Sequence, residues 1–383
     1  MSSPLLPAQA HTHTPIFPSS LSTGYNNAAG TIPTELAMLT ELIQIDLARN
    51  ALTGKIPTEL VTLTNLALFA LGKNQLTGEF PGYITAFTNL EVLYLSSNMI
   101  TGSVPADLSA LTKVTAFAVD NNLMTGPIAQ LGAMTSLDTL YLEENQFTMT
   151  LDATTFTELK DLVELDMSVN EIDGTVPAHF FTNFVNMTVL DLHQNSLSES
   201  LPPFPTNTKL KFLAVSSNNL SGMVPGSMSN LASLTHLDLS NNGFTGAMPT
   251  ELGILTDLRY LFLASATYTA GTIPDEYKQL RRMRDLSLKD TNRNGQIPTW
   301  LGELDNIILL DLDSNQLTGA IPSEIGNMFW LQLLLLNRNQ LNGAIPTELG
   351  SLTRLRKYGV LWPLSVSLLF VLHPSPKRHR LQS

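Results

Sequence analysis

The stretch SLTHLDLSNNGFTGAMP, residues 233–249, decides the fold, because the same frame returns along most of the chain. Other copies read LTELIQIDLARNALTGKIP (39–57), NLEVLYLSSNMITGSVP (89–105) and NIILLDLDSNQLTGAIP (306–322). They share the pattern LxxLxLxxNxLxGxIP, with Phe or Met replacing Leu or Ile in places. The period is about 24 residues, and a period of that length indicates an array of stacked supersecondary units.

Each copy contains a short strand. In the copy quoted first, alternation places Leu237 and Leu239 on one face and His236, Asp238 and Ser240 on the other. We expect the leucine face to be buried and the other face to meet solvent. A single copy has no second layer over its apolar row, so neighbouring copies must stack and merge their leucines into one core.

An asparagine follows the strand in almost every copy. The chain turns inward there and leaves backbone groups without water or strand partners, and an amide supplies both donors and an acceptor for them. These asparagines are Asn26, Asn50, Asn74, Asn98, Asn122, Asn145, Asn170, Asn195, Asn218, Asn242, Asn315 and Asn339. Gly54 and Gly246 then permit a turn, while Pro57 and Pro249 prevent a continuing helix. The convex side should therefore consist of extended segments and short helical turns.

The repeated frame, and L-T-G-x-I-P after the strand in particular, resembles the plant-type leucine-rich-repeat family. That family includes receptor-like kinase ectodomains, receptor-like proteins and polygalacturonase inhibitors. The match extends from about Asn26 to Tyr358. The resemblance implies an α/β fold, a right-handed solenoid curved into a superhelix, with a parallel concave β-sheet and a convex side of extended segments and short 3-10 or α turns.

Three segments are expected along the chain. Residues 1–21 are rich in Pro, Ser and Thr and should form a disordered arm. Residues 22–358 should form the solenoid, with about 14 repeats of about 24 residues. Residues 359–383 form an atypical tail, in which Pro363 occupies the place of the next ladder asparagine and an apolar run precedes a basic end.

The tail has three alternative interpretations. It could be a cap over the open end of the core, with Leu364, Leu368, Leu369 and Phe370 as its apolar contacts. It could be a membrane anchor, although a helix over 359–372 would measure about 21 Å against roughly 30 Å of hydrocarbon. It could also be an artefactual end of the gene model.

Composition limits the partners and the compartment. The net charge of −12 argues against a sequence-independent phosphate-binding role, so nucleic acid is not expected as a partner. Cysteine is absent, which excludes disulfides, thiolate metal sites and a cysteine nucleophile, whereas secreted members of the family usually carry paired cysteines in their caps. The N-terminus lacks the charged start and apolar stretch of a signal peptide. The resemblance indicates the cell surface or extracellular space, and the cytoplasm is the alternative.

No catalytic constellation is present. The kinase strings H-R-D and D-F-G are missing, and no nucleophile accompanies His193 or His236 at a recognisable spacing. The aspartates at the strand positions are typical of the repeat itself. We therefore expect no enzyme activity, no cofactor, no metal and no catalytic residue.

The outward strand positions are the candidate binding surface, because their composition varies independently of the core. Acidic residues occupy the middle of the expected concave face and aromatic residues flank them, which suits a basic protein or peptide. The candidate partner-binding residues are Tyr94, Tyr141, Glu143, Glu164, Asp166, Asp191, His193, Phe212, His236, Asp238, Tyr260 and Phe262. Histidines beside carboxylates would also make binding sensitive to pH near neutrality.

Three functions are open at this stage. The first is a monomeric, non-catalytic module that recognises a protein or peptide, similar to a receptor-like ectodomain. The second is an inhibitor or intracellular scaffold that uses the same surface, and the third is a fragment of a receptor-like kinase whose catalytic domain is missing. Ala266 and Thr291 interrupt the asparagine ladder. The interruption either re-aims Tyr268 and the nearby arginines toward a partner or is tolerated drift.

Overall fold

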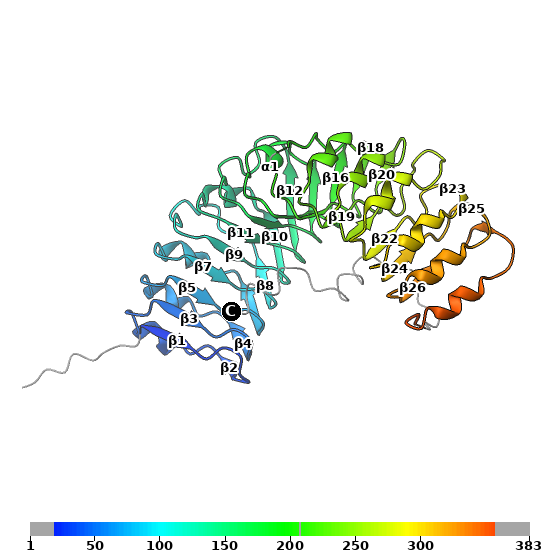
Figure 1. Ribbon diagram of the computed structural model, residues 1–383. Helices are drawn as coiled ribbons and strands as arrows, with labels where there is room; N and C mark the ends of the chain where they lie inside the picture. Colours follow the sequence, from blue (N-terminus) through cyan, green and yellow to red (C-terminus); the bar gives the residue numbers. More distant parts are fainter. Residues whose placement is uncertain (1–18, 207, 357–383) are drawn as a thin grey trace, which may run out of the picture.

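The computed structural model describes residues 19–206 and 208–356, which form a curved arc of stacked coils (Figure 1). The inner side of the arc is lined by one parallel sheet of 14 strands, each paired in register with the next. These strands are β1 Ser20–Ser22, β3 Gln44–Asp46, β5 Leu68–Ala70, β7 Val92–Tyr94, β9 Ala116–Ala118, β11 Thr139–Tyr141, β13 Glu164–Asp166, β15 Val189–Asp191, β17 Phe212–Ala214, β19 His236–Asp238, β21 Tyr260–Phe262, β22 Asp285–Ser287, β24 Leu309–Asp311 and β26 Leu333–Leu335.

A second set of parallel strands follows the ladder asparagines and is divided into two sheets. The first has 10 strands: β2 Ala29–Thr31, β4 Ala51–Lys55, β6 Gln75–Glu79, β8 Met99–Gly102, β10 Leu123–Pro127, β12 Gln146–Leu151, β14 Glu171–Gly174, β16 Ser196–Glu199, β18 Asn219–Met223 and β20 Gly243–Thr245. The other has three: β23 Asn294–Gln296, β25 Gln316–Gly319 and β27 Gln340–Leu341. The division falls at the repeat that carries Ala266.

The outer side carries short helical turns, as the Gly-x-Ile-Pro segments predict. Pro57 and Pro249 each directly precede a 3-10 turn, and Gly54 and Gly246 adopt φ values of +78° and +77°. The 3-10 turns are η1 Thr34–Met38, η2 Thr58–Thr62, η3 Gly82–Ala86, η4 Ala129–Ala133, η5 Gly226–Asn230, η6 Thr250–Ile254, η7 Asp275–Gln279, η8 Thr299–Glu303, η9 Ser323–Asn327 and η10 Thr347–Ser351, and one α-helix, α1, spans His179–Thr182.

The asparagine ladder works as the sequence predicts. The side-chain amide of Asn98 donates to the carbonyls of Leu71 at 3.2 Å and Leu95 at 3.0 Å. Its oxygen accepts the backbone N–H of Leu76 in the preceding repeat at 3.0 Å. Each rung thus ties two repeats together. At the interruption, Thr291 keeps one of these bonds through its hydroxyl, which donates to the Leu288 carbonyl at 2.6 Å.

The apolar side chains form one continuous core from Ile32 to Leu352. Tyr268 belongs to this core and is buried, so the interpretation that the interruption re-aims Tyr268 toward a partner is wrong. The reason is that Tyr268 occupies the position that Phe244 fills one repeat earlier, on the inward side of the turn. Arg281 and Arg282 lie on the surface and pair with Glu303 and Asp257.

Strand β1 pairs with β3 at residues 20–22, so the solenoid begins inside the arm that the sequence analysis placed at residues 1–21. Residues 1–18 and the tail at 359–383 lie outside the described residues, and so do the cap and membrane-anchor interpretations of that tail. Within residues 19–206 and 208–356, no helix has both the length and the apolar character needed to cross a bilayer.

Candidate functional site

Five carboxylates gather on the inner sheet between β11 and β19. We call Glu143, Glu164, Asp166, Asp191 and Asp238 the acidic cluster. Asp166 and Asp191 face each other in register on β13 and β15, and Asp238 lies two strands beyond Asp191. The three aspartates are 2%, 3% and 0% exposed, whereas the two glutamates are half-buried. The strands thus hold several acids in a small, poorly hydrated area.

Each of the three aspartates also stabilises the turn that ends its strand. Asp166 Oδ1 accepts the backbone N–H of Ser168 at 2.9 Å, and Asp238 Oδ1 accepts that of Ser240 at 3.0 Å. Asp191 Oδ1 accepts the N–H of His193 at 3.2 Å. This pattern is the local side-chain-to-backbone bond that Asp forms readily in turns. One oxygen of each carboxylate therefore has a structural role.

His193 is the imidazole at the centre of the acidic cluster. Its Nδ1 lies 2.7 Å from Asp191 Oδ1. Burial by itself lowers the pKa of His193, but the charges of Asp191, Asp238 and Glu143 and the bond to Asp191 raise the pKa above its ordinary value. His193 therefore holds a positive charge among these acids to a higher pH than an isolated histidine would.

Asp238 is the most deeply buried member of the acidic cluster. Burial raises the pKa of its carboxyl group, while the Ser240 and Ser216 groups and the charge of His193 act in the opposite direction. Its Oδ2 atom has no hydrogen-bond partner of normal geometry among the described residues. A buried carboxylate oxygen without a donor is costly unless a cation or donor reaches it. Asp238 is 0% exposed, and the side chain of Ser216 interacts with its carboxyl group.

Aromatic rings form a row beside the acidic cluster. Phe212, His236 and Tyr260 occupy matching positions on β17, β19 and β21. The Phe212 and His236 rings are stacked with centroids 4.3 Å apart, and the His236 centroid lies 5.2 Å from that of Tyr260. Phe262 adds a fourth ring at 5.7 Å from His236. We call these four residues the aromatic row.

Two tyrosines lie at the opposite edge of the acidic cluster. The hydroxyl of Tyr141 donates to Glu164, and burial followed by this bond raises the pKa of Tyr141 well above its usual range. Burial and the charges of Asp138 and Glu164 raise the pKa of Tyr94. Both tyrosines therefore stay neutral and can donate a hydrogen bond. The acidic cluster therefore lies between these two tyrosines and the aromatic row along the sheet.

One expectation about this face is wrong. The sequence analysis predicted that the outward strand residues meet solvent, but Tyr141, Asp166, Asp191, Phe212, Asp238 and Phe262 are buried and the other six candidates are half-buried. Side chains on adjacent strands contact one another, as Tyr141 does with Glu164 and Phe212 with His236, and these contacts account for part of the burial. Alternation along one strand cannot report contacts between strands.

The sequence analysis also missed residues that belong to the same face. Ser216 and Ser240 are buried beside Asp238, each two residues after the end of its strand. Val189 and Ala214 form a small apolar cluster with Phe212. The serines could have been found in the sequence from the third outward position of each repeat. Val189 and Ala214 could have been found from the register of the strands. Small side chains at this position carry no charge or ring that would mark them in the sequence.

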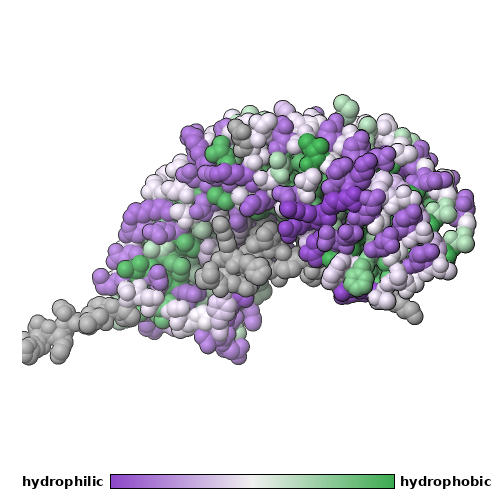
Figure 2. All heavy atoms as spheres, in the orientation of Figure 1, coloured by the Kyte–Doolittle hydropathy of each residue, from purple (hydrophilic) through white to green (hydrophobic). Residues whose placement is uncertain are grey.

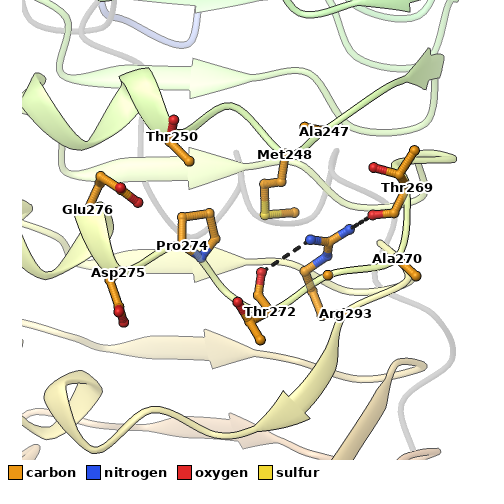
Figure 3. A pocket seen from close by; sticks show the side chains of 11 residues that line it. Ala247, Met248, Thr250, Thr269, Ala270, Thr272, Pro274, Asp275, Glu276 and Arg293 are labelled. Atoms are coloured by element: carbon orange, nitrogen blue, oxygen red, sulfur yellow. Dashed lines mark hydrogen bonds between the residues drawn. The ribbon is translucent and has the colours of Figure 1, made fainter.

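A pocket of about 360 Å³ lies at the interruption of the second sheet (Figure 3). Arg293 lines it and is 2% exposed. Its guanidinium donates to the carbonyls of Thr291 at 2.9 Å, Thr272 at 3.2 Å and Thr269. Arg293 stands where other repeats place a buried apolar residue, so its bonds satisfy backbone groups at the irregularity. We assign the pocket a structural origin.

The described part of the chain contains no group of three or more side chains able to hold a metal ion. The visible surface of the arc is mainly hydrophilic, with small separate apolar patches (Figure 2). A broad apolar face is not seen in this view.

Comparisons with known proteins agree with the repeat architecture. Models of leucine-rich repeats match residues 203–244, 89–111 and 306–328. A search of curated protein sequences found no match. The sequence comparisons thus identify the repeat and no individual curated relative.

Solved structures give longer matches. The plant peptide hormone receptor RGFR1, solved in complex with RGF2, is 32% identical with a TM-score of 0.79, and the match covers 88% of this chain and 54% of that one. The Arabidopsis receptor kinase HAESA, in complex with the peptide hormone IDA and the co-receptor SERK1, is 26% identical with a TM-score of 0.74, covering 88% and 60%. The Leptospira interrogans LRR protein LIC12759 is 29% identical with a TM-score of 0.68, covering 88% and 82%.

The chain is a plant-type leucine-rich-repeat protein, as its repeats, its solenoid and these matches together show. It spans about half the length of the receptor structures RGFR1 and HAESA. The bacterial match shows that this architecture is shared beyond plants.

Proposed function

We propose that this protein is a non-catalytic recognition module that binds a basic peptide, or a basic segment of a protein, on its inner sheet in the manner of a receptor-like ectodomain. The observation that carries the proposal is the acidic cluster adjoining the aromatic row on one continuous sheet. Likeness to RGFR1 and HAESA, both solved with peptide hormones, supports a peptide as the ligand class. An inhibitor or a scaffold would use the same surface, and these receptor neighbours favour the receptor type.

The dimensions of the face suit an extended peptide. Tyr94 on β7 and Phe262 on β21 are seven strand spacings apart in the sheet, and strands lie about 4.8 Å apart, which gives about 34 Å. A fully extended chain advances about 3.4 Å per residue, so about ten residues would cross the site. Lysine or arginine side chains would pair with the acidic cluster. The aromatic row would contact the apolar part of the same peptide.

The chemistry predicts which contacts matter most. Charge-assisted bonds to partly buried carboxylates are stronger than those at an exposed surface, because water screens them less. Aromatic side chains contribute large contact area at small entropic cost. A peptide that engages only the acids should bind weakly and in a strongly salt-dependent way. One that also reaches the aromatic row should bind more tightly and lose less affinity in salt.

A peptide selection tests the proposal. A random library of twelve-residue peptides displayed on phage is selected on the full chain, and affinities of the winners are measured by fluorescence anisotropy. We expect the winners to be enriched in Lys and Arg and to lose about tenfold or more in affinity on a Glu143→Gln/Glu164→Gln chain. Glu158→Gln with Glu324→Gln is the matched control, because it removes two acids outside the acidic cluster. Selected peptides that bind the unaltered chain, the cluster variant and the control variant with equal affinity would contradict the proposal.

A further inference from the structure

We propose that two copies of this chain associate edge to edge, in opposite directions, about a two-fold axis at β15. The contact surface is the lateral edge of the arc, which we define as the residues one to four places before each strand of the inner sheet. No member of the acidic cluster or the aromatic row lies on this lateral edge, so the inference is independent of the proposed function. The dimer would replace the monomer that the sequence analysis expects.

The lateral edge is a continuous and regular strip. The residue directly before each inner strand donates its backbone N–H to the carbonyl of the equivalent residue one repeat earlier, as Glu91 does to Ala67 at 2.8 Å and Arg284 to Arg259 at 2.7 Å. This ladder continues without a gap from the repeat of β3 to that of β26. Equivalent side chains therefore recur at the strand spacing of about 4.8 Å and form columns along the edge.

Charge is divided between the two halves of the lateral edge, in the columns one and three places before the strands. From β3 to β13 these columns carry four acids and one lysine: Glu41, Glu91, Asp138, Asp161 and Lys113. From β17 to β26 they carry five cations and one aspartate: Lys209, Lys211, Arg259, Arg282, Arg284 and Asp257. One half thus complements the other in charge, so a second copy laid on the edge in the opposite direction is the partner that fits.

A two-fold axis at β15 brings these charges into pairs. Such an axis sets each repeat against the repeat that lies equally far from β15 on the other side. Three pairs of opposite sign result within the columns, and symmetry forms each of them twice: Asp161 with Lys209, Lys113 with Asp257, and Glu91 with Arg284. In these columns from β3 to β26, no charge meets another of its own sign.

Other positions of the axis fit less well. An axis at β13 would oppose Lys113 to Lys209, and an axis at β17 would place Lys209 against its own copy. An axis midway between β15 and β17 would oppose Lys113 to Arg282. An axis midway between β13 and β15 avoids like charges but gives two pairs of opposite sign instead of three. The distribution of charge therefore favours β15.

Apolar residues of the edge agree with the same axis. Val185 lies four places before β15 and is 53% exposed, so the axis sets this side chain against its own copy. Ala67, directly before β5, would face Ile308, directly before β24. Contact between exposed apolar side chains removes them from water and adds to the attraction between the charges.

The size of the edge indicates a modest affinity. The strip from β3 to β26 covers twelve strand spacings, about 58 Å, and four residues of extended chain give a width of about 10 Å. Two such strips bury about 1,200 Å² in total, which is at the lower end for specific interfaces. The net charge of −12 on each copy opposes association. We therefore expect a dissociation constant on the order of 10 μM.

Two of the cations are already positioned along the edge. The ammonium group of Lys209 donates to Asn186 Oδ1 at 2.7 Å, and that of Lys113 donates to Asn89 Oδ1 at 2.8 Å. Each bond links a repeat to the preceding one and restricts a long side chain. Less side-chain entropy is then lost when an aspartate of the second copy approaches.

Charge reversal in matched pairs tests the inference by sedimentation velocity of the full chain, between about 1 and 100 μM. The unaltered chain should dimerise within this range. Glu91→Lys with Asp161→Lys makes the first half of the edge basic, and Lys209→Glu with Arg284→Glu makes the second half acidic. Each variant alone should lose at least tenfold in its association constant. An equimolar mixture of the two variants should recover dimers, because each basic edge then meets an acidic one.

A control variant carries the same change in net charge on another surface. Glu59→Lys with Glu251→Lys reverses two exposed acids in the outer turns η2 and η6, and this chain should dimerise as the unaltered one does. An unaltered chain that stays monomeric at about 100 μM would overturn the inference. Charge-reversed chains that dimerise alone, or a mixture that recovers no dimers, would also overturn it.

A single thiol locates the axis, since the chain contains no cysteine. Mild oxidation with copper phenanthroline should link Val185→Cys chains into disulfide dimers at least tenfold faster than Ile254→Cys chains. Ile254 is the control because it is 66% exposed in the outer turn η6, away from the lateral edge. Equal rates for the two variants would contradict an axis at β15. Peptide binding by the inner sheet can be present or absent with either result.

Discussion

The imidazole of His236 stacks on the ring of Phe212 with centroids 4.3 Å apart and an interplanar angle of 23°, and the ring of Tyr260 lies 5.2 Å from it. The three residues come from consecutive strands in exact register of their backbones. Stacking holds the rings in place before any ligand arrives, so little side-chain entropy remains to be lost on binding. The parallel sheet thus converts a period in the sequence into a preorganised surface.

Removing two rings of this row should abolish tight binding. We expect Phe212→Ala with Tyr260→Ala to weaken a selected peptide by at least tenfold, because aromatic anchors contribute a large share of interface affinity. Isothermal titration calorimetry measures the affinity, and thermal unfolding checks that the solenoid persists. Tyr25→Ala is the control, since Tyr25 is an exposed tyrosine at the far N-terminal end of the arc. Similar losses in both variants would contradict this role of the row.

Binding of a basic peptide should strengthen as pH rises. The pKa of His193 lies above its ordinary value of 6.5, so protonated His193 cancels one negative charge of the acidic cluster below that pH. Affinity should increase as pH passes upward through the raised pKa and the imidazole becomes neutral. Anisotropy between pH 5.5 and 8 measures this slope, and His193→Gln should flatten it. An unchanged slope in that variant would assign the titration to another group.

The same histidine affects stability with the opposite sign. A raised pKa in the folded state means that folding favours the protonated form. The stabilisation from His193 is therefore complete below about pH 6.5 and is lost as pH rises through the folded pKa. Urea unfolding measures the free energy of unfolding of the parent and His193→Gln chains at pH 5.5 and pH 8. The difference in this free energy between the two chains should be larger at pH 5.5. A larger difference at pH 8 would mean that folding lowers the pKa of His193 instead of raising it.

Deleting a ladder amide should cost about 1–3 kcal/mol of stability. Asn122 donates to the Leu95 carbonyl at 3.1 Å and the Val119 carbonyl at 3.0 Å, and it accepts the Ile100 N–H at 3.0 Å. Asn122→Ala leaves the buried Ile100 N–H without this acceptor, at about 1–3 kcal/mol. The Leu95 and Val119 carbonyls each keep a second donor, the side-chain amides of Asn98 and Asn145. Denaturant unfolding measures the loss. Asn65→Ala is the matched control and should change stability little, because exposed Asn65 makes one bond, to the Thr40 carbonyl.

The repeat with Ala266 should be the weakest point of the interior. By the geometry of Asn242, an asparagine at position 266 would reach the carbonyls of Leu239 and Leu263, which alanine cannot do. We expect residues 264–295 to exchange amide hydrogens fastest within the solenoid. Ala266→Asn should slow that exchange and add about 1 kcal/mol of stability. Uniform exchange along residues 19–356 in the parent would contradict this prediction.

Much of the fold follows from the sequence because one physical rule is repeated. Position in the frame determines whether a side chain faces the core, so Leu237 and Leu239 are buried as predicted, and the amide of Asn98 bonds across repeats as predicted. The start of the solenoid was misplaced because β1 lacks the leucine-rich pattern and is ordered by pairing with β3. Local composition could not reveal a partner 24 residues away.

The candidate surface was predictable in position but less so in environment. All twelve candidate residues lie on or directly after strands of the inner sheet. Their burial and stacking depend on which side chains adjoin across strands, as Phe212 adjoins His236. Arg293 illustrates the same limit, because its frame position indicates an apolar core residue and only the folded structure shows the three carbonyls that it bonds.

The break in the second set of strands, between β20 and β23, has a mechanical consequence. At that place the coils on the second side are joined by single backbone bonds, such as Thr267 N–H to the Phe244 carbonyl at 3.0 Å, and no strand ladder continues. A pulling force applied to the two ends of the arc would meet less resistance there than at the continuous ladders. Extension should thus begin there as a discrete step, leaving two intact blocks on either side. The two blocks would each resist extension more strongly than the segment that joins them.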